Sequence, residues 1–413
     1  MNNYGWIILV ALLTGYTMHF IATRLNVLSM PVTPPPEFAD IVDEATCQRS
    51  RSYASDKSSL ELISSTVDLA VLLLWWWLGG FNTLDVWVRS FALGDIGSGL
   101  LYIGTLMVLS RFISMPFSIY STFVVEERYG FNKTTPRTYI LDLIKGVLLS
   151  AVLGLPLLAG ILWFFAYAGP DAWLYCWGAT TAFVLLIQYI APVWLMPLFN
   201  RFTPVEDGDL KRAILEYTGS VGFAVADIFE VDGSRRSSKA NAFFSGFGKN
   251  RRIALFDTLI KNYSIAELVA VLAHEVGHQK KRHMLQSLLF GIAHMGVMFY
   301  LLSFFLVEEG LFTAFKMDNI AIYTGLTFFS MLLTPLDLIL GPILKWVSRK
   351  NEFQADSFAV QTIPERLALI SALKKLSVDN LSNLTPHPFY VILNYSHPPL
   401  IGRMKAIKGV LVI

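Results

Sequence analysis

Seven long apolar stretches limit what this chain can fold into. They cover approximately residues 5–22, 61–80, 100–123, 143–168, 173–197, 286–307 and 320–345. Each is close to the roughly 20 apolar residues that an α-helix needs to cross a bilayer. Only 15% of the 413 residues are charged, against about 25% in soluble globular proteins. The sequence therefore predicts a multi-pass α-helical membrane protein with seven transmembrane helices, the first of them retained rather than cleaved as a signal peptide.

Two polar segments interrupt this pattern. We expect a membrane domain formed by residues 1–198 and 284–347, and a polar domain formed by residues 199–283 and 348–413. Residues 209–217 have helical spacing, whereas 226–234, 239–248 and 251–258 have the β-branched and aromatic content of strands. The polar domain is therefore expected to mix helices and strands.

The basic residues of the short loops predict an orientation. The first and third loops hold seven Lys or Arg: Arg24, Arg49, Arg51, Lys57, Arg128, Lys133 and Arg137. The second, fourth and sixth loops together hold two, Arg89 and Lys316. Because basic loops stay in the cytoplasm, we expect the N-terminus outside and the polar domain on the cytoplasmic side of an integral membrane protein.

Charge and cysteine content exclude some functions. The formal net charge is +2, and no block of like charges is present, so nucleic-acid binding is not expected. Cys47 and Cys176 are too few for a disulfide framework or a cysteine-based metal site. Any metal must therefore be held by histidine and carboxylate.

Three ionisable residues, Asp68, Arg111 and Asp337, lie inside the apolar stretches. A charge in hydrocarbon is costly, so such residues face other protein groups or water. They predict either ion pairs between helices or a water-filled interior.

The segment HEVGH, residues 274–278, carries the main chemical signal. It follows Ser264 and Glu267, whose spacing is that of a capping box at the start of a helix. On a helix, His274 and His278 share one face and can bind one metal. Glu275 lies beside them and can reach a water molecule without being a ligand.

A catalytic zinc site needs a third protein ligand, and NEFQAD, residues 351–356, offers two carboxylates on one helical face. We predict Glu352 as the third ligand. We predict that Asp356 accepts a hydrogen bond from a ligand histidine and fixes its tautomer. A solvated helix face is the alternative for such spacing alone, and the upstream HEVGH favours the metal.

The remaining histidines divide into two groups. Four are not expected to bind metal. His19 and His294 lie in spans and are expected to pack or line a chamber, and His387 is expected in a loop. His283 is expected on the far side of the helix that carries His274 and His278. His397 lies in the rigid segment YSHPPL and is followed by Arg403. Both are candidates for stabilising a developing oxyanion.

Six motifs in this order resemble the type I CAAX prenyl endopeptidases, which are integral-membrane zinc metalloproteases of the gluzincin type. They are EERYGFNKTT (126–135), PLFNRFTPVEDGDLK (197–211), KANAFFSGFGKNRRIALFDTLI (239–260), AHEVGHQKKRH (273–283), NEFQADSFAV (351–360), and NYSHPPL (394–400) followed by Arg403. The first two distinguish the chain from shorter heat-shock membrane proteases.

The resemblance implies a fold and a set of roles. It implies seven helices forming a barrel around a water-filled chamber, with a zincin-like α+β metalloprotease domain. It implies one Zn²⁺ per chain on His274, His278 and Glu352, with Glu275 as general base. It also implies that Asp356 is a carboxylate behind the ligands, and that His397 and Arg403 contact the substrate or transition state. Asn241, Ala242 and Phe243 would form an edge strand that pairs with the substrate backbone.

The expected function is hydrolysis of a peptide bond near the C-terminus of prenylated CAAX-type substrates, by a zinc-activated water with a glutamate base. A quality-control protease that cleaves membrane proteins without prenyl groups is the alternative. A transporter with structural zinc is a further alternative, although structural zinc is closed by four protein ligands. The expected partners are a peptide or protein substrate and the lipid bilayer, and the sequence contains no signal for oligomeric state.

Overall fold

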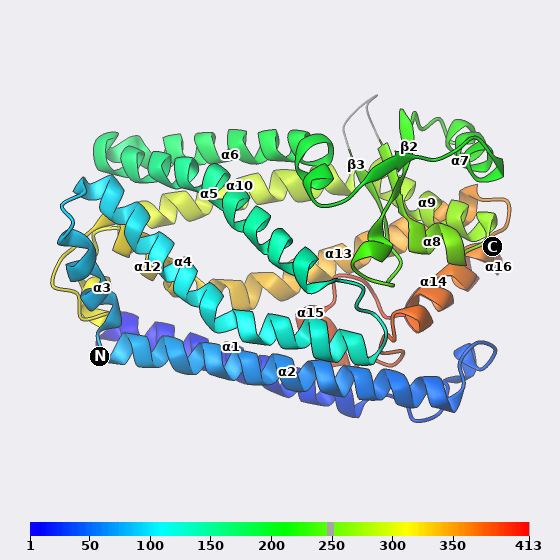
Figure 1. The fold of residues 1–413 in the computed structure, drawn as a ribbon, viewed down its shortest axis with the longest axis horizontal. Helices are drawn as coiled ribbons and strands as arrows, with labels where there is room; N and C mark the ends of the chain where they lie inside the picture. The colour runs from blue at the N-terminus through cyan, green and yellow to red at the C-terminus, as the bar shows by residue number, and fades with distance from the viewer. Residues whose placement is uncertain (246–251, 413) are drawn as a thin grey trace.

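The computed structural model describes residues 1–245 and 252–412, and long helices make up most of it (Figure 1). Within these residues, six helical segments are long and apolar enough to cross a membrane: Asn3–Leu28 (α1), Glu44–Trp77 (α2), Gly94–Glu126 (α4, Gly94–Tyr120, and a π-helical turn), Pro136–Tyr167 (α5), Gly169–Leu198 (containing α6, Ala172–Ile190) and His283–Phe305 (α10). They confirm a multi-pass helical membrane protein.

The seventh predicted span is bent. Helix α12 (Ile322–Leu332) and helix α13 (Thr334–Thr362) meet at an angle of 52°. Pro335, the second residue of α13, has no N–H to donate and its ring crowds the carbonyl four residues earlier. Taken as one span, the pair brings the total to seven. Helix α13 then continues without a break past residue 347, where the sequence predicted a domain boundary.

Short helices close the end of the molecule that holds the N-terminus (Figure 1). These are α3 (Gly80–Arg89) and α11 (Glu309–Ala314). Phe81, Phe315 and Phe328 pack there in one buried aromatic cluster. The C-terminus and the sheet lie at the opposite end.

A cavity of about 600 Å³ lies among α4, α5, α10 and α12, and Arg111 is part of its lining. Within residues 1–245 and 252–412, no ion pair joins Asp68, Arg111 or Asp337 to another side chain. The described part of the chain therefore does not contain the predicted interhelical ion pairs. Arg111 is exposed where it lines this open pocket.

The first and third loops meet the polar domain at the sheet end. Arg128 pairs with Asp56 at 2.6 Å, and Lys239 pairs with Glu126 at 3.0 Å. Lys239 directly precedes the segment that leads into an edge strand, so these contacts connect the membrane helices to the sheet.

The sheet has four strands in the order β1-β2-β4-β3. They are β1 (Phe202–Pro204), β2 (Asp227–Val231), β3 (Ala242–Ser245) and β4 (Arg252–Phe256). The β2–β4 pair is parallel and the other two pairs are antiparallel. Three strands lie where predicted but are shorter, with residues 246–248 and 251 of the predicted strands outside the described residues. The sequence missed β1, which has three residues.

Helices pack on this sheet and on one another and form with it the second hydrophobic core. They are α7 (Asp209–Ser220), which includes the predicted helix, α8 (Asp257–Asn262), α9 (Ile265–Lys280), the end of α13, α14 (Ala368–Asp379) and α16 (Leu400–Val412). Helix α15 (Pro388–Asn394) packs instead against α1 and α13. Leu268, Leu272 and Val276 lie one turn apart on α9 and are all buried in this core. This buried stripe fixes the rotation of α9 and hence the direction of its polar side chains.

Candidate metal centre

Helix α9 begins at the capping box that the sequence predicted. Ser264 N–H donates to Glu267 Oε2 at 2.9 Å, and Glu267 N–H donates to Ser264 Oγ at 3.3 Å. Glu267 also accepts hydrogen bonds from Ser371 at 2.6 Å and Lys375 at 2.7 Å on α14. The start of the helix is therefore tied to the core of the polar domain.

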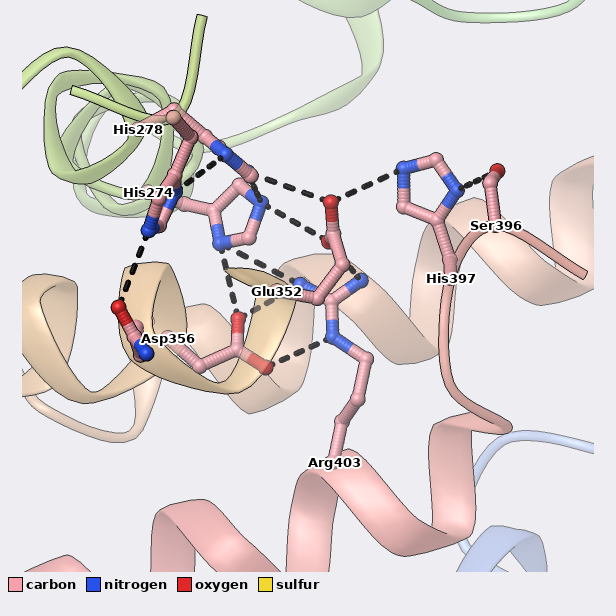
Figure 2. Close-up of polar contacts among 9 residues, drawn as sticks. His274, His278, Glu352, Asp356, Ser396, His397 and Arg403 are labelled. Carbon is pink, nitrogen blue, oxygen red and sulfur yellow. Dashed lines mark hydrogen bonds and ion pairs between the residues drawn. The ribbon is translucent and has the colours of Figure 1, made fainter. Parts of the chain in front are cut away.

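His274, His278 and Glu352 meet at one point. One ligand atom from each lies within 4.8 Å of the other two. The Nε2 atoms of the two histidines are 3.2 Å apart, and they lie 3.3 Å and 3.2 Å from the carboxylate oxygens of Glu352. Figure 2 shows the carboxylate directed at the two imidazole rings. The structure thus brings together the three ligands that the sequence predicted on separate segments.

Close contact between α9 and α13 makes this meeting possible. A Cβ atom at Gly277 would lie 3.0 Å from both Cα and the carbonyl oxygen of Ala355. Backbone atoms cannot rotate away, so only glycine permits this separation of the helices. Gly277 lies between the two histidine ligands and Ala355 lies one turn from Glu352, which places the tightest contact beside the ligands.

The residues present fit a metal cation. Glu352 is only 4% exposed, and its Oε2 has no hydrogen-bond partner among the described residues. The groups nearest to this oxygen, His274 Nε2 and Arg403 Nη1, lie 3.3 Å and 3.6 Å away. A buried ionised carboxylate that is incompletely paired is costly, and a cation between it and two imidazole nitrogens would reduce that cost. Two histidines and one carboxylate are also the donor set of zinc hydrolases that keep one coordination position open.

Protons compete for this site. Burial opposes protonation of His274, but the carboxylates of Asp356 and Glu352 outweigh it and raise the pKa of His274 to about 9. A metal ion that binds His274 must displace this proton at neutral pH.

Asp356 lies behind His274, as predicted. Its Oδ1 is 2.9 Å from His274 Nδ1, and it accepts two hydrogen bonds from Arg403 at 2.6 Å and 2.8 Å. With Nδ1–H directed at Asp356, the Nε2 lone pair of His274 faces the other ligands. Asp356 and Arg403 are 1% and 7% exposed, so this ion pair is buried.

Arg403 rises from α16 toward the ligands (Figure 2). Its guanidinium is occupied by Asp356, and Nη1 lies 3.6 Å from Glu352 Oε2. The structure therefore places Arg403 behind the three predicted ligands, next to the carboxylates of Asp356 and Glu352. Its predicted contact with a substrate or transition state stays a prediction.

Glu275 is half-buried beside the ligands and makes no hydrogen bond or ion pair with any described residue. Burial raises its pKa. A free carboxylate with a raised pKa is suited to accept a proton near neutral pH.

His397 stands on the open side of the site. Its Nε2 is 3.4 Å from Glu352 Oε1, and its side chain is 63% exposed. The preceding segment is held by Arg349, which donates to the carbonyls of Val391 at 3.0 Å and Tyr395 at 2.7 Å. Because Arg349 and Glu352 share α13, one helix sets both the third ligand and the loop that presents His397.

The predicted substrate strand lies at an edge of the sheet. Ala242 and Phe243 belong to β3, which pairs with β4 and with no other described strand. Asn241 precedes the strand, is exposed, and its Oδ1 accepts from the N–H of Ala242 at 2.9 Å. Substrate binding by these residues stays a prediction.

Sequence reasoning missed the position of His283. It assumed a helix that continues past residue 282, which would place His283 on the far side. Helix α9 ends at Lys280, and Arg282 adopts a left-handed conformation with φ 59°. His283 therefore turns back, and its Nδ1 lies 3.1 Å from Nδ1 of His278.

The other histidines have ordinary contacts. His19 lies 3.5 Å from Glu61, His294 stacks on Phe290, and His387 caps α15 by accepting from the N–H of Phe389. That these three residues do not bind metal stays a prediction.

Known proteins resemble this chain over almost its whole length. Residues 24–201 match a family model described as CAAX prenyl protease N-terminal, five membrane helices. Residues 204–411 match the model of peptidase family M48. The division between the two models lies at the start of β1, close to where the membrane helices end.

Relatives and one solved structure extend the match. A CAAX prenyl protease 1 homolog of Oryza sativa is 36% identical over 405 residues, covering 95% of each chain. CAAX prenyl protease 1 of Saccharomyces cerevisiae is 33% identical, covering 91% of this chain and 88% of the relative. The crystal structure of Ste24p from S. mikatae has a TM-score of 0.93 and 32% identity, covering 98% of this chain and 99% of that chain.

Proposed function

The chain belongs to peptidase family M48, and from that premise we propose that it is a zinc-dependent membrane endopeptidase that cleaves prenylated CAAX-type substrates near their C-terminus. That it is a membrane metalloprotease follows from the family. The choice of zinc, the prenylated substrate and the roles of individual residues are the proposal. The substrate class is supported by the curated relatives, which bear the name CAAX prenyl protease 1.

One observation carries the proposed chemistry. His274, His278 and Glu352 bring one ligand atom each within 4.8 Å, while the adjacent Glu275 has no partner among the described residues. Three ligands and a free base are what a hydrolytic site requires. A structural site would need a fourth protein ligand, and the described residues bring together three.

Each residue then has a task. A metal ion bound here would act as a Lewis acid that acidifies a water molecule and polarises the scissile carbonyl. Glu275 takes the proton from the attacking water and returns it to the leaving amine. Asp356 keeps the proton of His274 on Nδ1, away from the ligand face.

The substrate would lie along the exposed side of the site. His397 is directed at Glu352 from that side, where it can donate a hydrogen bond to the developing oxyanion. The free edge of β3 would pair with the extended substrate backbone, with Asn241, Ala242 and Phe243 as its contact residues.

We further propose that the end of the molecule that holds the sheet and the metal site faces the cytoplasm, and that the N-terminus lies outside. The first and third loops carry seven basic residues, against two in the second, fourth and sixth. Ion pairs attach the third loop to helix α2 and to the polar domain, and the N-terminus is at the other end (Figure 1). Labelling of single cysteines placed in the second loop, at residues 90–93, and in the third loop, at residues 130–134, tests this orientation in intact cells. Labelling of the third loop from outside contradicts it.

Glu275→Gln tests the mechanism. It removes the base without removing a ligand, so the variant should keep its zinc and lose peptide cleavage. Glu216→Gln, at an exposed position on α7, is the matched control and should cleave normally. Normal turnover by Glu275→Gln refutes the assignment of the base.

Comparison of a farnesylated CAAX peptide with its unmodified form tests the substrate. Faster cleavage of the farnesylated peptide is expected. Equal rates, or preference for unmodified membrane segments, would favour the quality-control function instead.

A further inference from the structure

His278 needs a hydrogen-bond partner that the proposed mechanism does not yet supply. For Nε2 to offer its lone pair to a metal, the single proton of the neutral imidazole must be on Nδ1. His274 meets this need through Asp356. Among the described residues, the group that faces Nδ1 of His278 within hydrogen-bond distance is not a carboxylate but Nδ1 of His283, at 3.1 Å.

We propose that His283 is a positioning residue that fixes the tautomer and ring orientation of His278, with Gln354 as the outer end of the same chain of hydrogen bonds. His278 Nδ1–H donates to Nδ1 of His283, which must therefore be unprotonated. The one proton of neutral His283 is then on Nε2, and it donates to Oε1 of Gln354 at 3.1 Å. Every donor meets an acceptor in this direction. The inference rests on the metal site proposed above.

The fold builds this contact at two points. The left-handed conformation of Arg282, with φ 59°, turns the chain back after α9, so that the first residue of α10 faces the last ligand of α9. Gln354 lies on α13, two residues beyond the third ligand, Glu352. The chain of hydrogen bonds therefore joins α9, α10 and α13.

The alternative is that His283 is a buried histidine that only fills space. It is 3% exposed, so packing contributes to its position. Packing alone, however, does not require one ring nitrogen to face a ligand and the other an amide oxygen. The two ligand histidines would also differ in character, since His274 faces a charged carboxylate and His278 a neutral imidazole.

Two near-isosteric variants separate positioning from packing. In His283→Asn, the side-chain oxygen can replace Nδ1 and still accept from His278. In His283→Gln, the amide can replace Nε2 and reach Gln354, but the acceptor for His278 is lost. The readouts are the dissociation constant for Zn²⁺ by chelator competition and the visible spectrum of the Co²⁺ form, measured on the full-length protein in detergent.

We expect His283→Gln to bind Zn²⁺ about 10–100-fold more weakly, the usual cost of losing an outer partner of a metal ligand. His283→Asn should stay close to the wild type in affinity and spectrum. A loss for Asn as large as for Gln, or no loss for either, overturns the proposal. Gln354→Met, at an exposed position, does not disturb the core and should weaken Zn²⁺ binding by a smaller factor, whereas unchanged binding removes Gln354 from the proposal.

His274→Ala distinguishes the two levels of the proposal. If this variant keeps full Zn²⁺ affinity, the metal site itself is wrong. If it loses Zn²⁺ while His283→Gln does not, only the role of His283 is wrong.

Discussion

Replacing Gly277 by alanine should separate the two helices that hold the metal ligands. The new Cβ would lie 3.0 Å from Cα and O of Ala355 and 3.3 Å from Cβ of Phe358. Carbon atoms pack at about 3.5–4.0 Å, so α9 and α13 must move apart by a few tenths of an ångström. Metal–ligand distances tolerate only about 0.2 Å.

Two effects of opposite sign set the size of the change. Overpacking costs about 1–3 kcal/mol, while alanine in place of a helical glycine gains up to about 1 kcal/mol. We therefore expect a net loss of up to about 2 kcal/mol in unfolding free energy. Because the displacement lies between His274 and His278, Zn²⁺ affinity should fall by at least about tenfold.

Gly219→Ala is the matched control. Gly219 is also in a helix, α7, but is exposed, and apart from the backbone of its own helix and its chain neighbours no described atom lies within 4 Å of the position that a Cβ would take there. The same chemical change should there stabilise the protein by about 0.5–1 kcal/mol. Thermal unfolding in detergent and chelator competition measure both variants. Wild-type Zn²⁺ affinity in Gly277→Ala, with a melting temperature no lower than that of Gly219→Ala, refutes the reasoning.

Four further predictions concern the surroundings of the ligands. Burial opposes protonation of His274, but the neighbouring carboxylates outweigh it and raise its pKa to about 9. Because Zn²⁺ must displace this proton, its affinity should fall about tenfold for each pH unit below that value. In the metal-free protein the same raised pKa contributes stability that is complete below about 6.5 and is lost as the pH rises through about 9, which a series of melting curves would detect. Asp356→Asn removes the charge that pairs with the buried Arg403 at 2.6 Å and leaves it only Glu352 at 3.6 Å, so the unfolding free energy should fall by about 3–5 kcal/mol, measured by thermal unfolding. Arg349→Ala releases the carbonyls before the loop of His397, so kcat should fall while the zinc content of the purified protein stays constant.

Local patterns were enough to predict the membrane spans and much of the polar domain. The length of the apolar stretches predicted the spans, and the spacing of Ser264 and Glu267 predicted the start of α9. The four-residue spacing of His274 and His278 placed both on one face. These features depend on neighbours within one or two helical turns, where the geometry of the chain is known in advance.

Breaks in helices were less accessible. The bend of 52° between α12 and α13 and the end of α9 at Lys280 both lie inside stretches whose composition favours a continuing helix. Pro335 was a visible signal for the first. For the second, Arg282 adopts a left-handed conformation that non-glycine residues rarely take, and no local pattern indicates it.

Residue types and their local spacing were enough to identify the segments that could hold a metal. How close these segments come to one another depends on the packing of the whole domain. Glu352 meets the two histidines because Gly277 lets two helices, far apart in the chain, approach until a Cβ would touch backbone. His283 meets His278 because a single residue turns the chain back. Both are contacts between elements, and their distances depend on packing across the whole domain rather than on the spacing of residues along one helix.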